Sequence, residues 1–102
     1  MNDYGADLDL RLVRYFTVLA EQLNFSRAAT ELRVAQPSLS RQIQRLEKRL
    51  GVRLLDRTPQ GALLTEAGKA FLPQAQALLQ AARQATLTAR AYVRPGRSSS
   101  VT

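Results

Sequence analysis

The first helical pattern of the chain lies between residues 10 and 24. Apolar side chains recur there at steps of three and four, which places them on one face of an α-helix. Asp9 is a suitable N-cap, because its carboxylate can accept from the first free amides, and Asn24 is expected to end the helix. Residues 1–8 are polar and are expected to form a flexible N-terminus. The apolar face consists of Leu12, Tyr15, Phe16, Leu19 and Leu23.

Two short helices joined by a tight turn are predicted between residues 24 and 51. The first should begin after Ser26, another good N-cap, and end near Arg33. The second should open at Gln36–Pro37, because proline fits a first helical turn, and Gly51 is the expected stop. Its apolar stripe is formed by Leu39, Ile43, Leu46 and Leu50. Small polar and basic residues at the start of this helix and apolar ones behind are typical of a DNA-recognition helix.

Residues 52–64 change character. Two short apolar runs flank a turn-forming stretch that contains Pro59 and Gly61. This pattern predicts a small β-hairpin, which after a recognition helix would be a wing. The alternative is a plain surface loop, because short strands give a weak sequence signal.

A longer helix is predicted from Glu66 to about Arg94, with Thr65 as its N-cap and a mild kink at Pro73. Apolar residues repeat along it at intervals of seven, which indicates a helix–helix seam. At roughly 40 Å this helix would outreach the small core, so its far half is expected to pack on a second copy of the chain. The alternative is a helix that folds back on its own core. The expected interface is Phe71, Ala75, Leu78, Ala82, Ala85, Ala89 and Tyr92.

The charge of the chain favours a polyanionic partner. Its 102 residues carry a formal net charge of +7, and the stretch 26–60 holds eight basic residues against three acidic ones. Neutralising phosphates would release condensed counterions, although charge alone does not separate nucleic acid from an anionic membrane. No stretch approaches the ~20 apolar residues of a membrane span, and no signal peptide is recognisable, so we expect a cytoplasmic protein.

Catalysis is the least favoured class of function. The sequence contains no cysteine and no histidine, which removes the usual thiolate nucleophile, the commonest general base and the commonest metal ligand. The eight acidic residues form no paired motif. We therefore predict a non-enzymatic protein without a metal or cofactor.

The outward residues of the helix that opens at Gln36 have the chemistry of DNA readout. Arg41 can pair bidentately with a guanine edge, and Gln36 or Gln44 can do the same with adenine. Pro37 and Ser38 allow close approach and contact with a thymine methyl group. Phosphate and flanking backbone contacts are expected from Ser26, Arg27, Arg33, Gln44, Arg45, Arg57 and Thr58. For each of these positions the alternative is a solvated surface residue.

At these residues the sequence strongly resembles the DNA-binding region of LysR-type transcriptional regulators. The matching pieces are LRLVRYFTVLAEQLNFSRAATEL, VAQPSLSRQIQRLEKRLGVRLLDRT and LLTEAGKAFLP, in order and without gaps. The resemblance implies a mainly α fold: three helices and a β-hairpin wing (9–65), then a linker and dimerisation helix (66–94) and a flexible tail or truncated hinge (95–102). The base-reading positions that it implies are Gln36, Pro37, Ser38, Ser40 and Arg41. The backbone contacts that it implies are Ser26, Arg27 and Arg57.

The resemblance also implies partners. Linker helices of two subunits would pack antiparallel in a homodimer that binds double-stranded DNA at an interrupted palindrome, with a tetramer open for a full-length protein. A small-molecule effector would bind only through a C-terminal domain absent from this chain, which favours an excised fragment over a naturally short protein. Gln60 and Ser38 depart from the family pattern, which weakens the transfer of a wing-tip contact and of the base preference.

Two other functions remain open from the sequence. The first is a non-specific architectural DNA-binding protein, which would show little loss of affinity on a scrambled operator. The second is a helix-mediated dimerisation module, which would dimerise without affinity for DNA. The favoured reading is sequence-specific DNA binding by a dimer, with a gap of about 4–10 kcal/mol between specific and non-specific sites.

Overall fold

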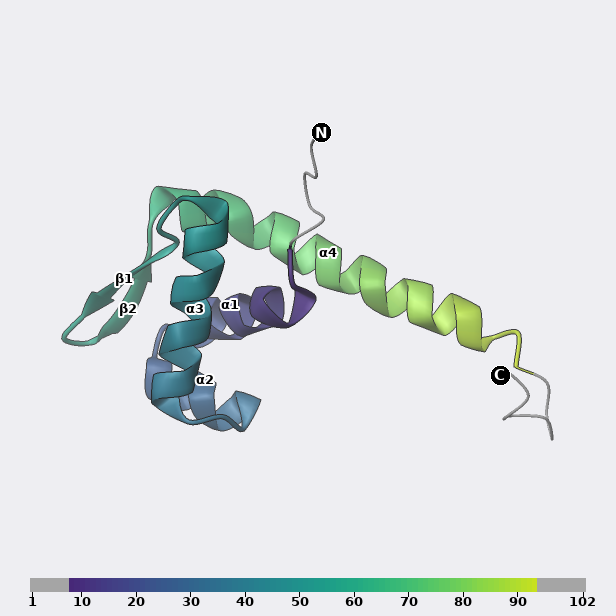
Figure 1. Cartoon of the computed structure of the whole chain (residues 1–102), viewed down its shortest axis with the longest axis horizontal. Helices are drawn as coiled ribbons and strands as arrows, with labels where there is room; N and C mark the ends of the chain where they lie inside the picture. Colours follow the sequence, from purple (N-terminus) through teal and green to yellow (C-terminus); the bar gives the residue numbers. More distant parts are fainter. Residues whose placement is uncertain (1–7, 94–102) are drawn as a thin grey trace.

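The computed structural model describes residues 8–93 and contains four helices and one two-stranded sheet within them. The elements follow the order α1 (Leu10–Gln22), α2 (Phe25–Leu32), α3 (Gln36–Leu50), β1 (Leu55–Thr58), β2 (Gly61–Leu64) and α4 (Glu66–Arg90). Helices α1 to α3 pack together, the hairpin projects beside α3, and α4 crosses α1 and continues away from the other helices (Figure 1). The mainly α architecture with a hairpin wing, predicted from the sequence, is confirmed.

Helix α1 is the centre of the core. Its N-cap is Asp9, whose Oδ1 accepts from the amide of Arg11 at 2.8 Å, as predicted. The apolar face packs against α2, α3 and α4, which explains why its inward side chains lose all contact with solvent. The largest fully buried side chains of the molecule are Phe16, Leu12, Leu19, Leu39, Leu46, Leu54 and Val13.

Helix α2 begins earlier than the sequence predicts. Its N-cap is Asn24, whose side chain accepts from the amide of Arg27 at 2.8 Å, so Ser26 lies inside the first turn and does not cap the helix. The cause is Leu23, which adopts a left-handed conformation with φ of 51° and ends α1 at Gln22. This sharp turn brings the Asn24 side chain over the first amides of α2 before Ser26 is reached.

The turn and helix α3 agree with the predicted helix-turn-helix. Arg33 is the left-handed C-cap of α2, and α3 opens at Gln36 with Pro37 in its first turn. Gly51 ends α3 with φ of 74° and donates its amide to the carbonyl of Glu47 at 2.8 Å. Ala28 is fully buried, and such small side chains let α2 approach α1 and α3 closely.

The hairpin forms the predicted wing. Its strands are antiparallel, with Leu55 opposite Leu64 and Thr58 opposite Gly61. The turn is narrower than the sequence suggests, since residues 56–58 belong to β1 and only Pro59 and Gln60 lie between the strands. The side chains of residues 56–58 can be polar within a strand, because strand pairing uses the backbone and one face of a hairpin meets solvent.

The wing is attached to the turn between α1 and α2. The amide of Ala62 donates to the carbonyl of Leu23 at 3.1 Å. Gly61 has φ of 141°, and a Cβ built on it would lie 2.3 Å from that same carbonyl oxygen. Only glycine fits here, because the backbones of two elements pass within the space that a side chain would need.

Helix α4 begins as predicted and ends earlier. The Thr65 side chain accepts from the amide of Gly68 at 3.0 Å, and the helix runs through Pro73 to Arg90 instead of Arg94. The amides of Tyr92 and Val93 bond three residues back, which tightens the end into turns. Residues 1–7 and 94–102 lie outside the described residues, and with them all of the predicted flexible ends, 1–8 and 95–102, except residue 8.

Candidate nucleic-acid interface

Helix α3 has one buried and one exposed face. Leu39, Ile43 and Leu46 are at most 3% exposed and hold the helix on the core. The predicted base-reading residues occupy other positions: Gln36, Pro37 and Arg41 are exposed, whereas Ser38 and Ser40 are half-buried. The exposed face of α3 therefore carries hydrogen-bonding and basic groups at the start of a helix held firmly from behind.

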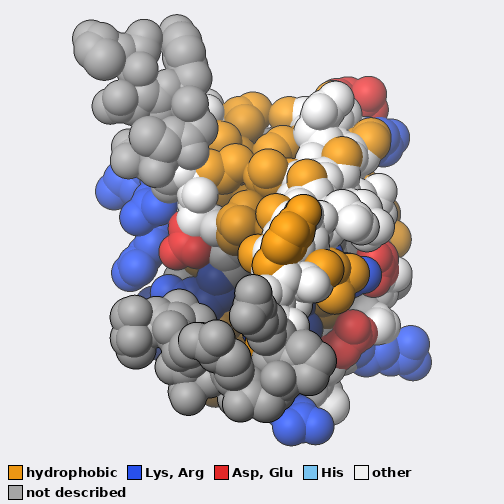
Figure 2. All heavy atoms as spheres, turned by 90° about the vertical axis from the view of Figure 1, so that its right-hand side faces the viewer, with side chains coloured by type: hydrophobic (Ala, Val, Ile, Leu, Met, Phe, Trp, Pro, Cys, Tyr) orange, Lys and Arg blue, Asp and Glu red, His pale blue; other side chains and the backbone are white. Residues whose placement is uncertain are grey.

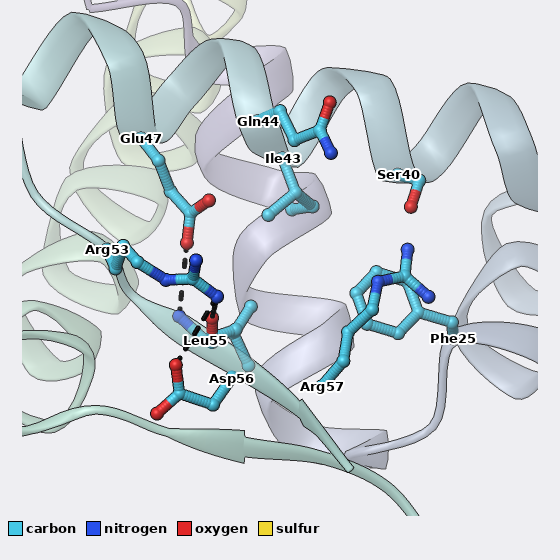
Figure 3. Close-up of a pocket in the computed structure, with 9 residues that line it drawn as sticks. All are labelled: Phe25, Ser40, Ile43, Gln44, Glu47, Arg53, Leu55, Asp56 and Arg57. Atoms are coloured by element: carbon cyan, nitrogen blue, oxygen red, sulfur yellow. Dashed lines mark hydrogen bonds and ion pairs between the residues drawn. The ribbon is translucent and has the colours of Figure 1, made fainter. Parts of the chain in front are cut away.

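A hollow of about 480 Å³ separates α3 from the wing (Figure 3). Ser40 and Gln44 line it from α3, and Arg57 lines it from β1. A second hollow of about 250 Å³ lies beside it toward the tip of the wing, where Gln36, Ser26, Arg57 and Thr58 meet. We call these two spaces together the α3–wing groove. The full lining is Asn24, Phe25, Ser26, Gln36, Ser40, Ile43, Gln44, Glu47, Arg53, Leu55, Asp56, Arg57, Thr58, Pro59, Gln60 and Gly61.

The groove brings together some of the predicted contacts and not others. Gln36, Ser40 and Gln44 recur every four residues, so they lie along the side of α3 that faces the wing. Pro37, Arg41 and Arg45 form the adjoining exposed row of the same helix. The groove lining includes none of Arg27, Arg33, Ser38, Arg41 and Arg45.

The basic side chains of this surface are available for a ligand. Among residues 8–93, no hydrogen bond or ion pair engages the guanidinium of Arg27, Arg41 or Arg45. An ion pair formed by such an exposed guanidinium with another side chain would contribute little free energy, so a phosphate could displace it easily. An unpaired guanidinium is suited to bidentate contact with a guanine edge or a phosphate.

Arg57 is oriented by an aromatic ring that the sequence analysis did not single out. Its Cζ lies 3.8 Å from the centroid of the Phe25 ring, which is 7% exposed. Figure 3 shows the guanidinium stacked over that ring and directed toward α3 near Ser40. A cation–π contact of this kind leaves the edge of the guanidinium free to donate hydrogen bonds.

Glu47 is the second residue that the sequence analysis missed. Its carboxylate accepts from the backbone amides of Leu54 and Leu55 at 2.8 and 3.2 Å, where the chain enters the wing. Next to it, Arg53 pairs with Asp56 at 3.3 Å. The sequence does set Glu47 apart, because it is the one acidic residue in the otherwise basic helix α3.

The predicted helix–helix seam is divided along α4. Ala75 is fully buried, and Phe71 and Leu78 pack on the same core, with the Phe71 ring centroid 5.3 Å from that of Phe16. Ala75 thus has no surface for a second copy, because α1 of its own chain covers it. The near half of α4 follows the alternative of a helix packed on its own core.

The far half of α4 leaves the rest of the seam uncovered. Ala82 is half-buried, and Ala85, Ala89 and Tyr92 are exposed, Tyr92 by 84%. Leu87 and Val93, which are not part of the predicted interface, are also exposed. Figure 2, viewed from the side of this end of α4, shows hydrophobic side chains gathered in the middle of the face. The uncovered part of the seam is Ala82, Ala85, Ala89 and Tyr92, which we call the far seam.

Residues 8–93 contain neither a metal-binding cluster nor a helix that could cross a membrane. No group of three or more acidic, histidine or cysteine side chains is arranged to hold a metal ion there. In the same part of the chain, every helix is too short or too polar to cross a membrane.

A three-helix core with a recognition helix, a hairpin wing and a basic exposed face defines the winged helix-turn-helix class of DNA-binding domains. The comparison with known families makes the assignment specific. The sequence model of the bacterial regulatory helix-turn-helix proteins of the lysR family matches residues 10–69, and the chain belongs to that family. The prediction of a non-enzymatic regulator agrees with this membership.

The chain is similar to regulators and to a solved complex. It is 51% identical over 73 residues to the uncharacterized HTH-type transcriptional regulator YnfL of Escherichia coli (strain K12), covering 72% of this chain and 25% of YnfL. It is 46% identical over 94 residues to the hca operon transcriptional activator HcaR of the same strain, covering 92% of this chain and 32% of HcaR. It thus spans about a quarter to a third of the length of these curated relatives.

Among solved structures, the DNA-binding domain of CbnR in complex with DNA is 43% identical and has a TM-score of 0.80. The match covers 84% of this chain and 99% of that one. This likeness supports the fold over most of the chain.

Proposed function

We propose that this chain reads specific double-stranded DNA sequences as the DNA-binding part of a dimeric transcriptional regulator in the cytoplasm. The observation that carries the proposal is the exposed face of α3, with unpaired Arg41, beside a groove across which the wing holds Arg57. An α-helix fits the major groove of B-DNA, and a wing can then reach the flanking backbone. The solved complex of the CbnR domain with DNA supports this use of the same fold.

The proposed roles follow the placement of the side chains. The base-reading group is Gln36, Pro37, Ser38, Ser40 and Arg41, of which the two serines are half-buried and the others exposed. Arg41 would pair with a guanine and Gln36 with an adenine. The backbone-contacting group is Ser26, Arg27, Arg33, Gln44, Arg45, Arg57 and Thr58, which would set register without reading sequence.

The proposed dimer uses the far seam of α4. Two exposed alanines, one half-buried alanine and one exposed tyrosine lie there on a helix that extends beyond its own core. Two antiparallel copies would bury them, and the twofold axis would present two reading helices to an inverted, interrupted repeat.

The experiment that tests the function is selection of bound duplexes from a random pool, with sedimentation of the protein in parallel. An inverted repeat of two half-sites, bound about 4–10 kcal/mol more tightly than a scrambled duplex, is the expected result. Equal affinity for the scrambled duplex would instead support an architectural DNA-binding protein. A dimer without DNA affinity would support a dimerisation module.

Arg41→Ala is expected to weaken binding to the selected operator by about 1–3 kcal/mol and to relax the preference at one base pair, because a bidentate contact is lost. Binding to a scrambled duplex should change little. Fluorescence anisotropy titrations at fixed salt measure both affinities. Arg14→Ala is the matched control, since Arg14 is exposed on α1 and lies outside the groove. Equal losses on both duplexes would remove Arg41 from the base-reading group.

Ala85→Asp is expected to weaken dimerisation tenfold or more, about 1.4 kcal/mol, because it introduces a charge into the far seam. Its neighbour Gln84 is also exposed but lies off the seven-residue repeat, so Gln84→Asp is the matched control. Sedimentation equilibrium over a concentration series gives the dissociation constants. A dimer of unchanged strength in the Ala85 variant contradicts this interface.

A further inference from the structure

Glu47 connects the recognition helix to the entrance of the wing. Its Oε2 accepts from two consecutive amides, those of Leu54 at 2.8 Å and Leu55 at 3.2 Å, and Figure 3 draws the second of these bonds. Its own carbonyl accepts from Gly51 and Val52 at 2.8 and 3.2 Å. One residue therefore holds the chain on both sides of the bend between α3 and β1.

The two amides that Glu47 binds lie at a well-packed junction. Leu54 and Leu55 are 1% and 4% exposed, and the carbonyl of Leu54 accepts from Thr65 at the start of α4. Hydrogen bonds to a carboxylate are about twice as strong as neutral ones. The position of β1 relative to α3 is thus fixed where it leaves the core.

The consequence appears further along the same two elements. Arg57 follows Leu55 by two residues, so the two side chains project from the same side of β1. Ser40 and Gln44 precede Glu47 by seven and three residues, so all three share one side of α3. Leu55, Arg57, Ser40, Gln44 and Glu47 all line one hollow. The bond of Glu47 to Leu55 therefore sets how far Arg57 stands from the DNA-facing side of α3.

A direct role of Glu47 in binding is unfavourable. A carboxylate repels phosphate oxygens, and this one has its Oε2 occupied by two amides. Its negative charge lowers the affinity for a polyanionic ligand. Any favourable contribution of Glu47 to DNA binding must therefore come from the backbone that it holds in place.

We propose that Glu47 is a positioning residue for DNA recognition. It sets the separation between the reading face of α3 and Arg57 of the wing, so that both reach one duplex at the same time. This proposal rests on the proposed function, since it takes Arg57 to contact the DNA backbone. Phe25 completes the arrangement. Glu47 holds strand β1, which carries Arg57, and the Phe25 ring holds the guanidinium of Arg57 itself.

The test compares two neutral variants of similar size. Glu47→Gln keeps one oxygen that can accept from both amides, whereas Glu47→Met keeps the shape and removes both acceptors. Both lose the charge, so any gain in non-specific affinity should be the same for the two. On the selected operator, Glu47→Met is expected to bind at least tenfold more weakly than Glu47→Gln, with loss of hydroxyl-radical protection at the backbone positions beside the wing.

A double-mutant cycle separates positioning from loss of stability. If Glu47 acts through Arg57, then Arg57→Ala should cost several-fold less operator affinity in the Glu47→Met protein than in the wild type. Far-UV circular dichroism at the assay temperature verifies that the variants are folded. If Glu47→Met does not fold, Glu47→Asp replaces it, since its shorter side chain keeps the charge and withdraws the acceptors; it should give the same footprint loss.

The possible outcomes are distinct. Equal operator affinity of the Glu47→Gln and Glu47→Met proteins, an additive cycle, or wild-type footprints in Glu47→Asp would each overturn the proposal. A wild-type protein that does not distinguish the selected operator from a scrambled duplex would instead overturn the proposed function.

Discussion

Gly61→Ala is expected to lower the free energy of unfolding by about 2–6 kcal/mol, which combines ~1–3 for backbone strain and ~1–3 for overpacking. The strain arises because φ of 141° is open to glycine and rarely to other residues. The overpacking arises because the new Cβ would lie 2.3 Å from the carbonyl oxygen of Leu23, which already accepts from Ala62. Relief requires the wing to leave the turn between α1 and α2, so operator affinity should fall as well.

Chemical denaturation followed by circular dichroism measures this loss. Gly51→Ala is the matched control, because Gly51 has φ of 74° and nothing lies within 4 Å of the position of a new Cβ. This variant should lose only the free energy of holding an alanine in the left-handed conformation, about 1–2 kcal/mol. If both variants lose the same stability, the close passage of the wing over Leu23 is not a constraint on the fold.

Phe16→Ala is expected to destabilise the protein by about 3–5 kcal/mol, since it removes a fully buried aromatic ring from the centre of the core. The ring packs on Phe71 of α4, so the same substitution should loosen the contact between α4 and α1. Thermal unfolding at a single wavelength gives the size of the loss.

A double-mutant cycle with Phe71→Ala isolates the ring–ring contact. The coupling is expected to be about 0.5–1.5 kcal/mol, as for other aromatic pairs. Denaturant-induced unfolding of the wild type should show a single transition with every probe, because α4 shares the core of α1. A separate early transition for α4, or a coupling of zero, would show that the long helix is only loosely joined to the other three.

The helices whose ends are marked by distinctive residues could be predicted closely. Asp9 begins α1, Pro37 opens α3 and Gly51 closes it, and each does so for a local reason that the sequence displays. The start of α2 could not be placed as well. Asn24 and Ser26 are equally good caps by residue type, and the choice between them depends on the left-handed turn at Leu23.

The seven-residue repeat of α4 predicted only part of how this helix packs. Seven-residue spacing predicts that α4 has a partner helix, but it does not say whether the partner belongs to the same chain. The near half, with Phe71 and Ala75, packs on its own α1, and only the far seam remains for another copy. Which half of α4 packs on its own chain depends on how far α1 extends along it. This is a property of the tertiary structure and is not visible in the repeat.

The exposed basic residues of the candidate site could be singled out from the sequence, whereas the residues that contact the wing from behind could not. Arg41 and Arg57 are basic residues at surface positions, and a search for DNA contacts finds them directly. Phe25 and Glu47 were overlooked because a single aromatic residue near a turn reads as core, and a single acid on a helix reads as a solvated position. Their contacts, a 3.8 Å stacking contact and two hydrogen bonds to backbone amides, form only in the folded chain.

In the proposed dimer, the packing of the near half of α4 on α1 would make each subunit a stiff arm with α3 at one end. In the proposed dimer, the distance between the two reading helices would then be fixed by the crossing of the two arms and could not adjust to the DNA. Such a dimer would be selective for the spacing between its half-sites as well as for their sequence. Inserting half a helical turn, about 5 base pairs, between otherwise perfect half-sites would turn one of them to the far side of the duplex, out of reach of the second arm.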